Sequence, residues 1–249
     1  MSGHSKWNNI KRKKEKTDGA RAKVFTKIGR ELAVAVKEGG GPDPNANSRL
    51  KDCIAKAKAA NVPNDNIDRI IKRAAGDGDD TKYENITYEG YGPNGVAVIV
   101  ETLTDNRNRT AGDLRHYFDK YGGNLGTNGC VSFLFQRKGV LEIEREGLDE
   151  DKVMEDCLEA GASDFQADGD VFTIYTEPDD FSGVLSDLEK KGYEFVTAEV
   201  QMVPNSSVKI DDEGAAARMQ HLLDILEDND DVQNVWHNWD NPDEEEEDQ

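Results

Sequence analysis

Residues 163–176 read Ser-Asp-Phe-Gln-Ala-Asp-Gly-Asp-Val-Phe-Thr-Ile-Tyr-Thr, with an Asp-Gly pair between two runs of strand-forming residues. Asp168-Gly169 is a strong signal for a hairpin turn, because both residues tolerate the backbone angles that a tight turn requires. The stretch therefore predicts two strands, 163–167 and 170–176, joined by a short turn.

The pattern continues on both sides of this hairpin. The flanking elements are a strand over 139–145 and a helix over 149–160 before it, and a helix over 179–191 and a strand over 193–203 after it. The resulting order, βαββαβ, is the ferredoxin-like pattern.

A second set of strands comes earlier in the chain, at Tyr83–Glu89 and Val96–Leu103. The six residues Gly90–Gly95 between them match the dinucleotide pattern GxGxxG. A strand follows them where that fingerprint needs a helix, so they predict a hairpin turn and no cofactor site. A helix near 110–121 and a glycine-rich loop, Gly122–Gly129, come next, and Val131–Phe135 reads as a strand.

The helix Glu213–Glu227 and the strand Val232–His237 are predicted to return and complete this earlier sheet, which otherwise has two strands. The segment between them is then an insertion. The fold class is α+β with three domains: a helical bundle over 1–78, an α/β domain over 79–129 plus 205–239, and an inserted ferredoxin-like domain over 130–204. An acidic disordered tail over 240–249 follows them.

Composition excludes several classes of protein. No run of apolar residues is long enough to span a membrane, and the start of the chain lacks the apolar core of a secretory signal. The cysteines Cys53, Cys130 and Cys157 are far apart, and no histidine lies near one at ligand spacing. Disulfides and a zinc site are therefore not expected, and a reducing cytoplasm fits.

Charge is distributed unevenly along the chain. Residues 1–75 contain 18 Lys/Arg and 8 Asp/Glu, a balance of +10, while the remaining 174 residues balance at −30 within a total of −20. Such asymmetry indicates a polyanion-binding end and a soluble, self-repelling remainder. The alternative is that each part merely has a solvated charged face.

The cations of the first domain are ordered as well as abundant. A helix from Asp18 to the glycines at 39–41 has an apolar face, with cations at helical spacing opposite it. The predicted contacts to nucleic acid are Lys6, Trp7, Lys11, Arg12, Lys13, Lys14, Lys16, Lys23, Lys27, Arg30, Arg107 and Arg109. Trp7 is the candidate for base stacking, and the long loop Gly39–Asn47 has a contact role or is a connector.

Arg107 and Arg109 stand at the start of a predicted helix, where free N–H groups favour an anion. Two guanidinium groups there could clamp a phosphate, or they could pair with local carboxylates while Asp105 or Asn108 caps the helix. His4, His116, His221 and His237 belong to different elements, and no catalytic pair is assigned.

Several motifs resemble the YebC/PmpR family: the opening Met1–Lys14, Asn61–Ile67, Tyr88–Gly95, Thr104–Thr110 and Gly122–Gly126. The resemblance extends over nearly the whole chain, although Cys130 stands where many relatives have a small serine. It implies a three-domain, cytoplasmic, non-enzymatic protein. Family members are described as DNA-binding transcriptional regulators, as mitochondrial translational activators, or as factors that help ribosomes through proline-rich stretches.

The charge pattern favours the translation role, because a ribosome offers rRNA phosphate beside basic proteins, and no clear helix-turn-helix signature is visible. The expected function is a ribosome-associated factor that contacts rRNA or tRNA through the basic domain. The alternative is a DNA-binding transcriptional regulator. We expect a monomer with no cofactor, no metal, no membrane contact and no small-molecule substrate.

Overall fold

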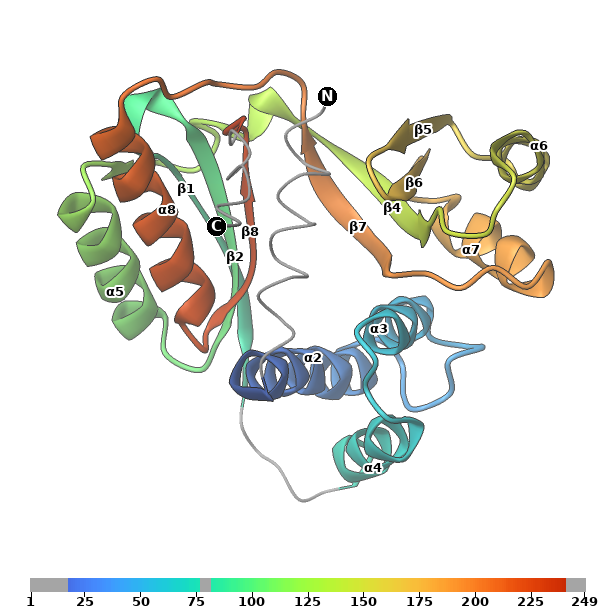
Figure 1. Cartoon of the computed structure of the whole chain (residues 1–249). Helices are drawn as coiled ribbons and strands as arrows, with labels where there is room; N and C mark the ends of the chain where they lie inside the picture. Colours follow the sequence, from blue (N-terminus) through green and yellow to red (C-terminus); the bar gives the residue numbers. More distant parts are fainter. Residues whose placement is uncertain (1–17, 77–81, 241–249) are drawn as a thin grey trace. The chain divides into compact units, whose positions relative to one another are not determined.

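The computed structural model describes residues 18–76 and 82–240, which belong to two compact units (Figure 1). Among these residues, the first unit contains 84–136 and 203–240, and the second contains 18–76, 82–83 and 137–202. The basic residues before residue 18, and residues 241–249 of the predicted acidic tail 240–249, lie outside the described residues.

The second unit begins with a helical bundle, whose described helices are α2 (Asp18–Glu38), α3 (Ser48–Ala59) and α4 (Asn64–Ala74). The predicted apolar face of α2 is confirmed, since Leu32 is fully buried and Val24 and Phe25 pack half-buried at the margin of the core. Leu50 from α3 and Ile67 from α4 complete this core. Helical spacing of apolar residues therefore produced three helices that share one small core.

Asn47 fixes the loop between α2 and α3. Its side chain accepts a hydrogen bond from Leu50 N at 3.0 Å, which caps α3, and donates to the carbonyls of Ala35 and Gly41, both at 2.8 Å. The loop is thus anchored at its base, while Pro42–Ala46 lies mostly at the surface. Helix α4 begins at Asn64, and Pro63 precedes it without a side-chain cap.

The second part of this unit has the predicted ferredoxin-like order of elements, βαββαβ. Its elements are β4 (Phe135–Glu144), α6 (Glu150–Ala160), β5 (Asp164–Asp168), β6 (Val171–Thr176), α7 (Phe181–Lys190) and β7 (Thr197–Pro204). The sheet has the order β5-β6-β4-β7, and β6 is antiparallel to both β5 and β4. Gly169 has a φ of 55°, as the predicted hairpin turn requires.

An ion triad joins the bundle to the insertion inside the second unit. Lys56 Nζ of α3 lies 3.1 Å from Glu31 Oε1 of α2 and 3.0 Å from Glu199 Oε2 of β7. Burial alone would lower the pKa of Lys56, but the two carboxylates outweigh it and raise that pKa well above its ordinary value. Beside the triad, the Ser182 hydroxyl of α7 donates to Asp52.

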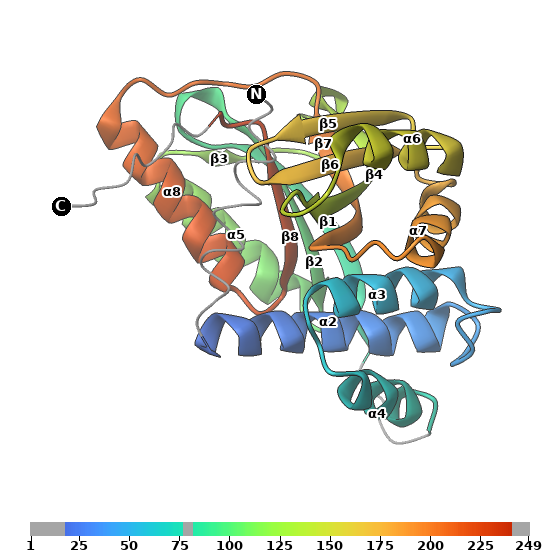
Figure 2. The same ribbon diagram turned by 45° about the vertical axis from the view of Figure 1, so that its right-hand side comes forward.

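The first unit is a sheet of order β3-β1-β2-β8, covered on one face by two helices (Figure 2). The strands are β1 (Glu84–Tyr91), β2 (Ala97–Thr104), β3 (Asn124–Leu125) and β8 (Val232–His237), and the helices are α5 (Arg107–Lys120) and α8 (Glu213–Asp228). The predicted return of α8 and β8 to this sheet is confirmed. The predicted hairpin turn is present, but it is shorter than Gly90–Gly95, because Gly90 and Tyr91 belong to β1 and Tyr91 pairs with Ala97.

The strand predicted at Val131–Phe135 is wrong, and Glu89 explains why. One carboxylate oxygen of Glu89 accepts from Gly129 N at 2.8 Å, and the other accepts from Val131 N and Ser132 N at 2.8 and 2.9 Å. These N–H groups are therefore not available to a sheet, and residues 132–134 form a 3-10 turn. Burial alone would raise the pKa of Glu89, but the three N–H groups outweigh it and lower that pKa.

Candidate nucleic-acid interface

The cations predicted on α2 lie on the side of the helix away from its core. Lys23, Lys27 and Arg30 follow the spacing i, i+4, i+7, which places them on one face. Lys23 is exposed, whereas Lys27 and Arg30 are half-buried. The Arg30 guanidinium carbon also lies 5.8 Å from the centre of the Tyr83 ring, so this side chain has a structural contact in addition to its predicted role.

More than half of the predicted contact residues cannot be placed. Lys6, Trp7, Lys11, Arg12, Lys13, Lys14 and Lys16 lie outside the described residues. Their part in an interface remains a prediction from charge and composition.

Helix α4 carries a cationic face that was not predicted from the sequence. Arg69, Lys72 and Arg73 are exposed, and they point away from the apolar stripe that contains Ile67. Arg69 donates to Asn66 Oδ1 at 2.9 Å, and none of the three forms an ion pair with the described residues. The signal was present in the sequence, because the three cations recur at helical spacing opposite the isoleucines.

The motif Thr104–Thr110 organises the junction between β2 and α5. Asn106 caps the helix by accepting from Arg109 N at 3.1 Å, so the cap is neither Asp105 nor Asn108. Asp231 completes the junction, where one of its carboxylate oxygens accepts from the hydroxyls of Thr104 and Thr110 at 3.2 and 2.8 Å.

The two arginines of this motif have different environments. The Arg109 guanidinium donates to Asp231 at 2.7 Å and to Asp105 at 2.9 Å, so carboxylates of the first unit already pair with its charge. Arg107 is exposed and forms no ion pair with a described residue. The local-carboxylate alternative therefore describes Arg109, and Arg107 is the better placed of the two for a phosphate. A nucleic-acid role for either arginine stays a prediction.

The described residues show little that resembles a reaction centre. In the ranges 18–76 and 82–240, no cluster of three or more His, Cys, Asp or Glu side chains is suited to hold a metal ion. Burial, followed by the charge of Glu31, raises the pKa of the Cys53 thiol to about 12, and burial raises that of Cys157 to about 11. Such thiols are poor nucleophiles at neutral pH. Trp236 is buried.

Within the described part of the chain, no helix has both the length and the apolar character needed to cross a membrane.

Comparison with known proteins gives matches along nearly the entire chain. A protein from Acetivibrio thermocellus named "Probable transcriptional regulatory protein" is 61% identical over 239 residues, which is 96% of this chain and 98% of that protein. A protein of the same name from Finegoldia magna is 60% identical, with the same coverage. A crystal structure of a conserved hypothetical protein from Aquifex aeolicus matches with a TM-score of 0.81 and 45% identity, covering 92% of this chain and 93% of that one.

Two family descriptions match in chain order. Residues 5–77 match the "TACO1/YebC protein N-terminal domain", and residues 83–239 match the "TACO1/YebC second and third domain". Together with the α+β fold and the identity to full-length relatives, these matches show that the chain belongs to the TACO1/YebC family.

Proposed function

We propose that this protein is a nucleic-acid-binding regulator of gene expression that acts on the ribosome. It contacts rRNA or tRNA through the basic N-terminal domain, residues 1–78, and eases stalled synthesis of proline-rich stretches. The observation that carries the proposal is the charge separation, since residues 1–75 balance at +10 and the rest of the chain at −30. We place the protein in the cytoplasm as a monomer, without enzymatic activity or cofactor.

The described cations support contact with phosphate more than reading of bases. Lys23 on α2 and Arg69, Lys72 and Arg73 on α4 are exposed on the outer faces of helices. Neutralising phosphates releases counterions, so such side chains add affinity without needing a particular sequence. RNA recognised by its shape needs this kind of contact and no groove-reading helix.

The second candidate is a DNA-binding transcriptional regulator, as the names of the relatives suggest. One structural observation favours it: α3 and α4 are joined by the short turn 60–63, in which Asn61 has a φ of 57°. Helix-turn-helix proteins use such a connection and read bases with the first turns of the second helix. In α4 those turns carry Asp65 and Asp68, which would repel phosphates, and the cations come later. We therefore rank this candidate second.

Ribosome co-sedimentation across a salt series, beside duplex-DNA binding, tests the proposal. We expect the protein to enter ribosomal fractions at low salt. Replacing Lys11, Arg12, Lys13 and Lys14 with alanine should flatten the salt dependence by a log–log slope of about 0.7–0.9 per lost phosphate contact. Absence from ribosomal fractions, together with tight selection of one promoter sequence, would establish the DNA-binding candidate instead.

A further inference from the structure

The exposed apolar side chains of the described surface are concentrated at one helix. Among the described residues four large apolar side chains are exposed, and three of them lie on or beside α6: Leu148 at 40%, Met154 at 39% and Leu158 at 57%. The core of the inserted domain takes Val153 and Cys157 from the opposite side of the same helix. The exposed residues are therefore not needed for the packing of α6 itself.

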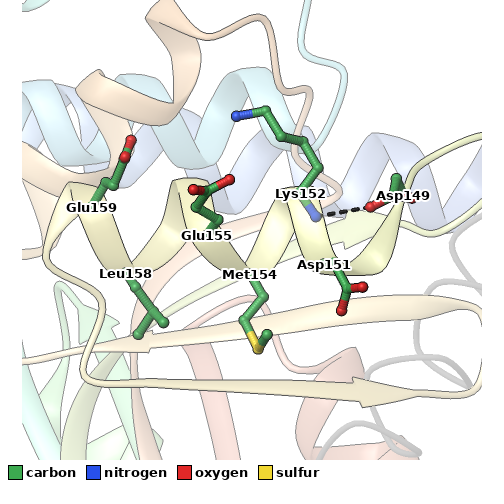
Figure 3. A pocket seen from close by; sticks show the side chains of 7 residues that line it. All are labelled: Asp149, Asp151, Lys152, Met154, Glu155, Leu158 and Glu159. Carbon is green, nitrogen blue, oxygen red and sulfur yellow. Dashed lines mark hydrogen bonds between the residues drawn. The ribbon is translucent and has the colours of Figure 1, made fainter.

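Met154 and Leu158 are one helical turn apart and form a continuous apolar stripe, which Figure 3 shows on the same side of α6 as Asp151. They line an open surface groove together with acidic side chains that include Asp151 and Glu155. An apolar stripe with a charged margin is typical of protein–protein contact surfaces.

The charge around this groove is negative. Asp151 and Glu155 are exposed and form no ion pair with the described residues. Lys152 is the cation that lines the groove, and its Nζ lies 2.8 Å from Asp156 Oδ1, so its charge is already matched. Residues 137–202 as a whole contain 6 Lys/Arg and 19 Asp/Glu. A cationic partner is thus attracted both locally and at longer range.

Nucleic acid does not suit this groove. The start of a helix usually favours an anion, but here Asp149, Glu150 and Asp151 already occupy the first turn, and the Asp149 side chain accepts from Lys152 N. A polyphosphate chain would meet these carboxylates and leave Met154 and Leu158 without apolar contact.

We infer that the exposed face of α6 is a docking surface for a cationic amphipathic segment of a protein partner. Apolar side chains of that segment cover Met154 and Leu158, while its lysines or arginines pair with Asp151 and Glu155. This interaction surface is distinct from the predicted nucleic-acid contacts and does not depend on whether the chain acts on RNA or on DNA.

The test uses the full chain with isotope-labelled methionine and leucine methyl groups. The probe is a synthetic helical peptide of lysine and leucine arranged with one apolar face. Its two comparison peptides are one of the same composition in scrambled order and one with glutamate in place of lysine. We expect the amphipathic cationic peptide to shift the Met154 and Leu158 methyl signals and to bind at least about tenfold more tightly than the scrambled peptide. Its affinity should fall in high salt.

Two variants separate the contributions. Met154→Ser with Leu158→Ser should weaken binding of the cationic peptide at least about tenfold. Asp151→Asn with Glu155→Gln should also weaken this binding and reduce its salt dependence. The control pair Glu189→Gln and Glu194→Gln removes the same charge from exposed positions outside α6, and it should leave binding nearly unchanged. Equal binding by the serine variant, or equal binding by the scrambled peptide, would overturn the inference. Self-association of the chain that the serine variant abolishes would also overturn it, because the occupant would then be a second copy.

Discussion

Replacing Lys56 with methionine tests how firmly the basic bundle is joined to the inserted domain. Methionine keeps most of the aliphatic stem and removes the charge, so Glu31 and Glu199 are left without the cation that lies between them. The substitution therefore probes electrostatics with little change in packing.

The expected loss follows from the two distances and the exposure. At about 3 Å and an effective dielectric constant near 20, each ion pair corresponds to roughly 5 kcal/mol of Coulomb attraction, most of which offsets desolvation. Removing one partner of a buried pair costs about 3–5 kcal/mol. The Lys56 and Glu199 side chains remain 22% and 18% exposed, so screening by water reduces our expectation to about 2–3 kcal/mol.

Hydrogen exchange of the α2 and α3 amides measures this loss where it occurs, as a fall in the free energy of local opening. The triple variant Lys56→Met, Glu31→Gln and Glu199→Gln should recover at least half of it, because it removes the two uncompensated carboxylates as well. A change below about 0.5 kcal/mol in Lys56→Met, or equal losses in the single and triple variants, would refute the electrostatic account.

Three further predictions address other parts of the chain. Glu89→Gln should lower the unfolding free energy of the first unit by about 1–3 kcal/mol, as measured by tryptophan fluorescence during urea unfolding. Because the N–H groups lower the pKa of Glu89, the advantage of the native residue should be present above about pH 4.3 and should shrink as the pH falls below that value. Arg109→Gln should lower the melting temperature because it breaks the pairs with Asp231 and Asp105, whereas Arg107→Gln should leave it unchanged; equal effects would contradict the separation of the two arginines. Neutralising Arg69, Lys72 and Arg73 with glutamine should reduce the log–log salt slope of RNA binding by about 2, and an unchanged slope would remove α4 from the interface.

Local patterns predicted much of the fold because their causes are local. The Asp168-Gly169 turn and the apolar face of α2 each follow from residues a few positions apart, and both are present in the structure. The order βαββαβ over residues 135–204 could be predicted for the same reason.

The candidate site was harder to predict because charge pairing is long-range. Arg109 and its partner Asp231 are 122 positions apart, so the sequence could not show that this arginine is used internally. Lys56 likewise lies in the basic domain, yet its charge is matched by Glu31 and Glu199. A count of cations therefore overestimates the number available to a nucleic acid.

The two faces proposed for the second unit make different demands on a binding partner. The cations of α4 need phosphate, whereas the apolar stripe at Met154 and Leu158 needs a basic protein surface. Naked RNA offers the first alone, and a ribosome offers both. We therefore expect Met154→Ser with Leu158→Ser to leave binding to naked rRNA unchanged and to weaken binding to intact ribosomes. On ribosomes its effect should add to that of the Arg69, Lys72 and Arg73 glutamine variant, because the two sets share no contact. If the serine variant weakened naked RNA binding equally, the α6 face would belong to the nucleic-acid interface and the division of roles between the two faces would be wrong.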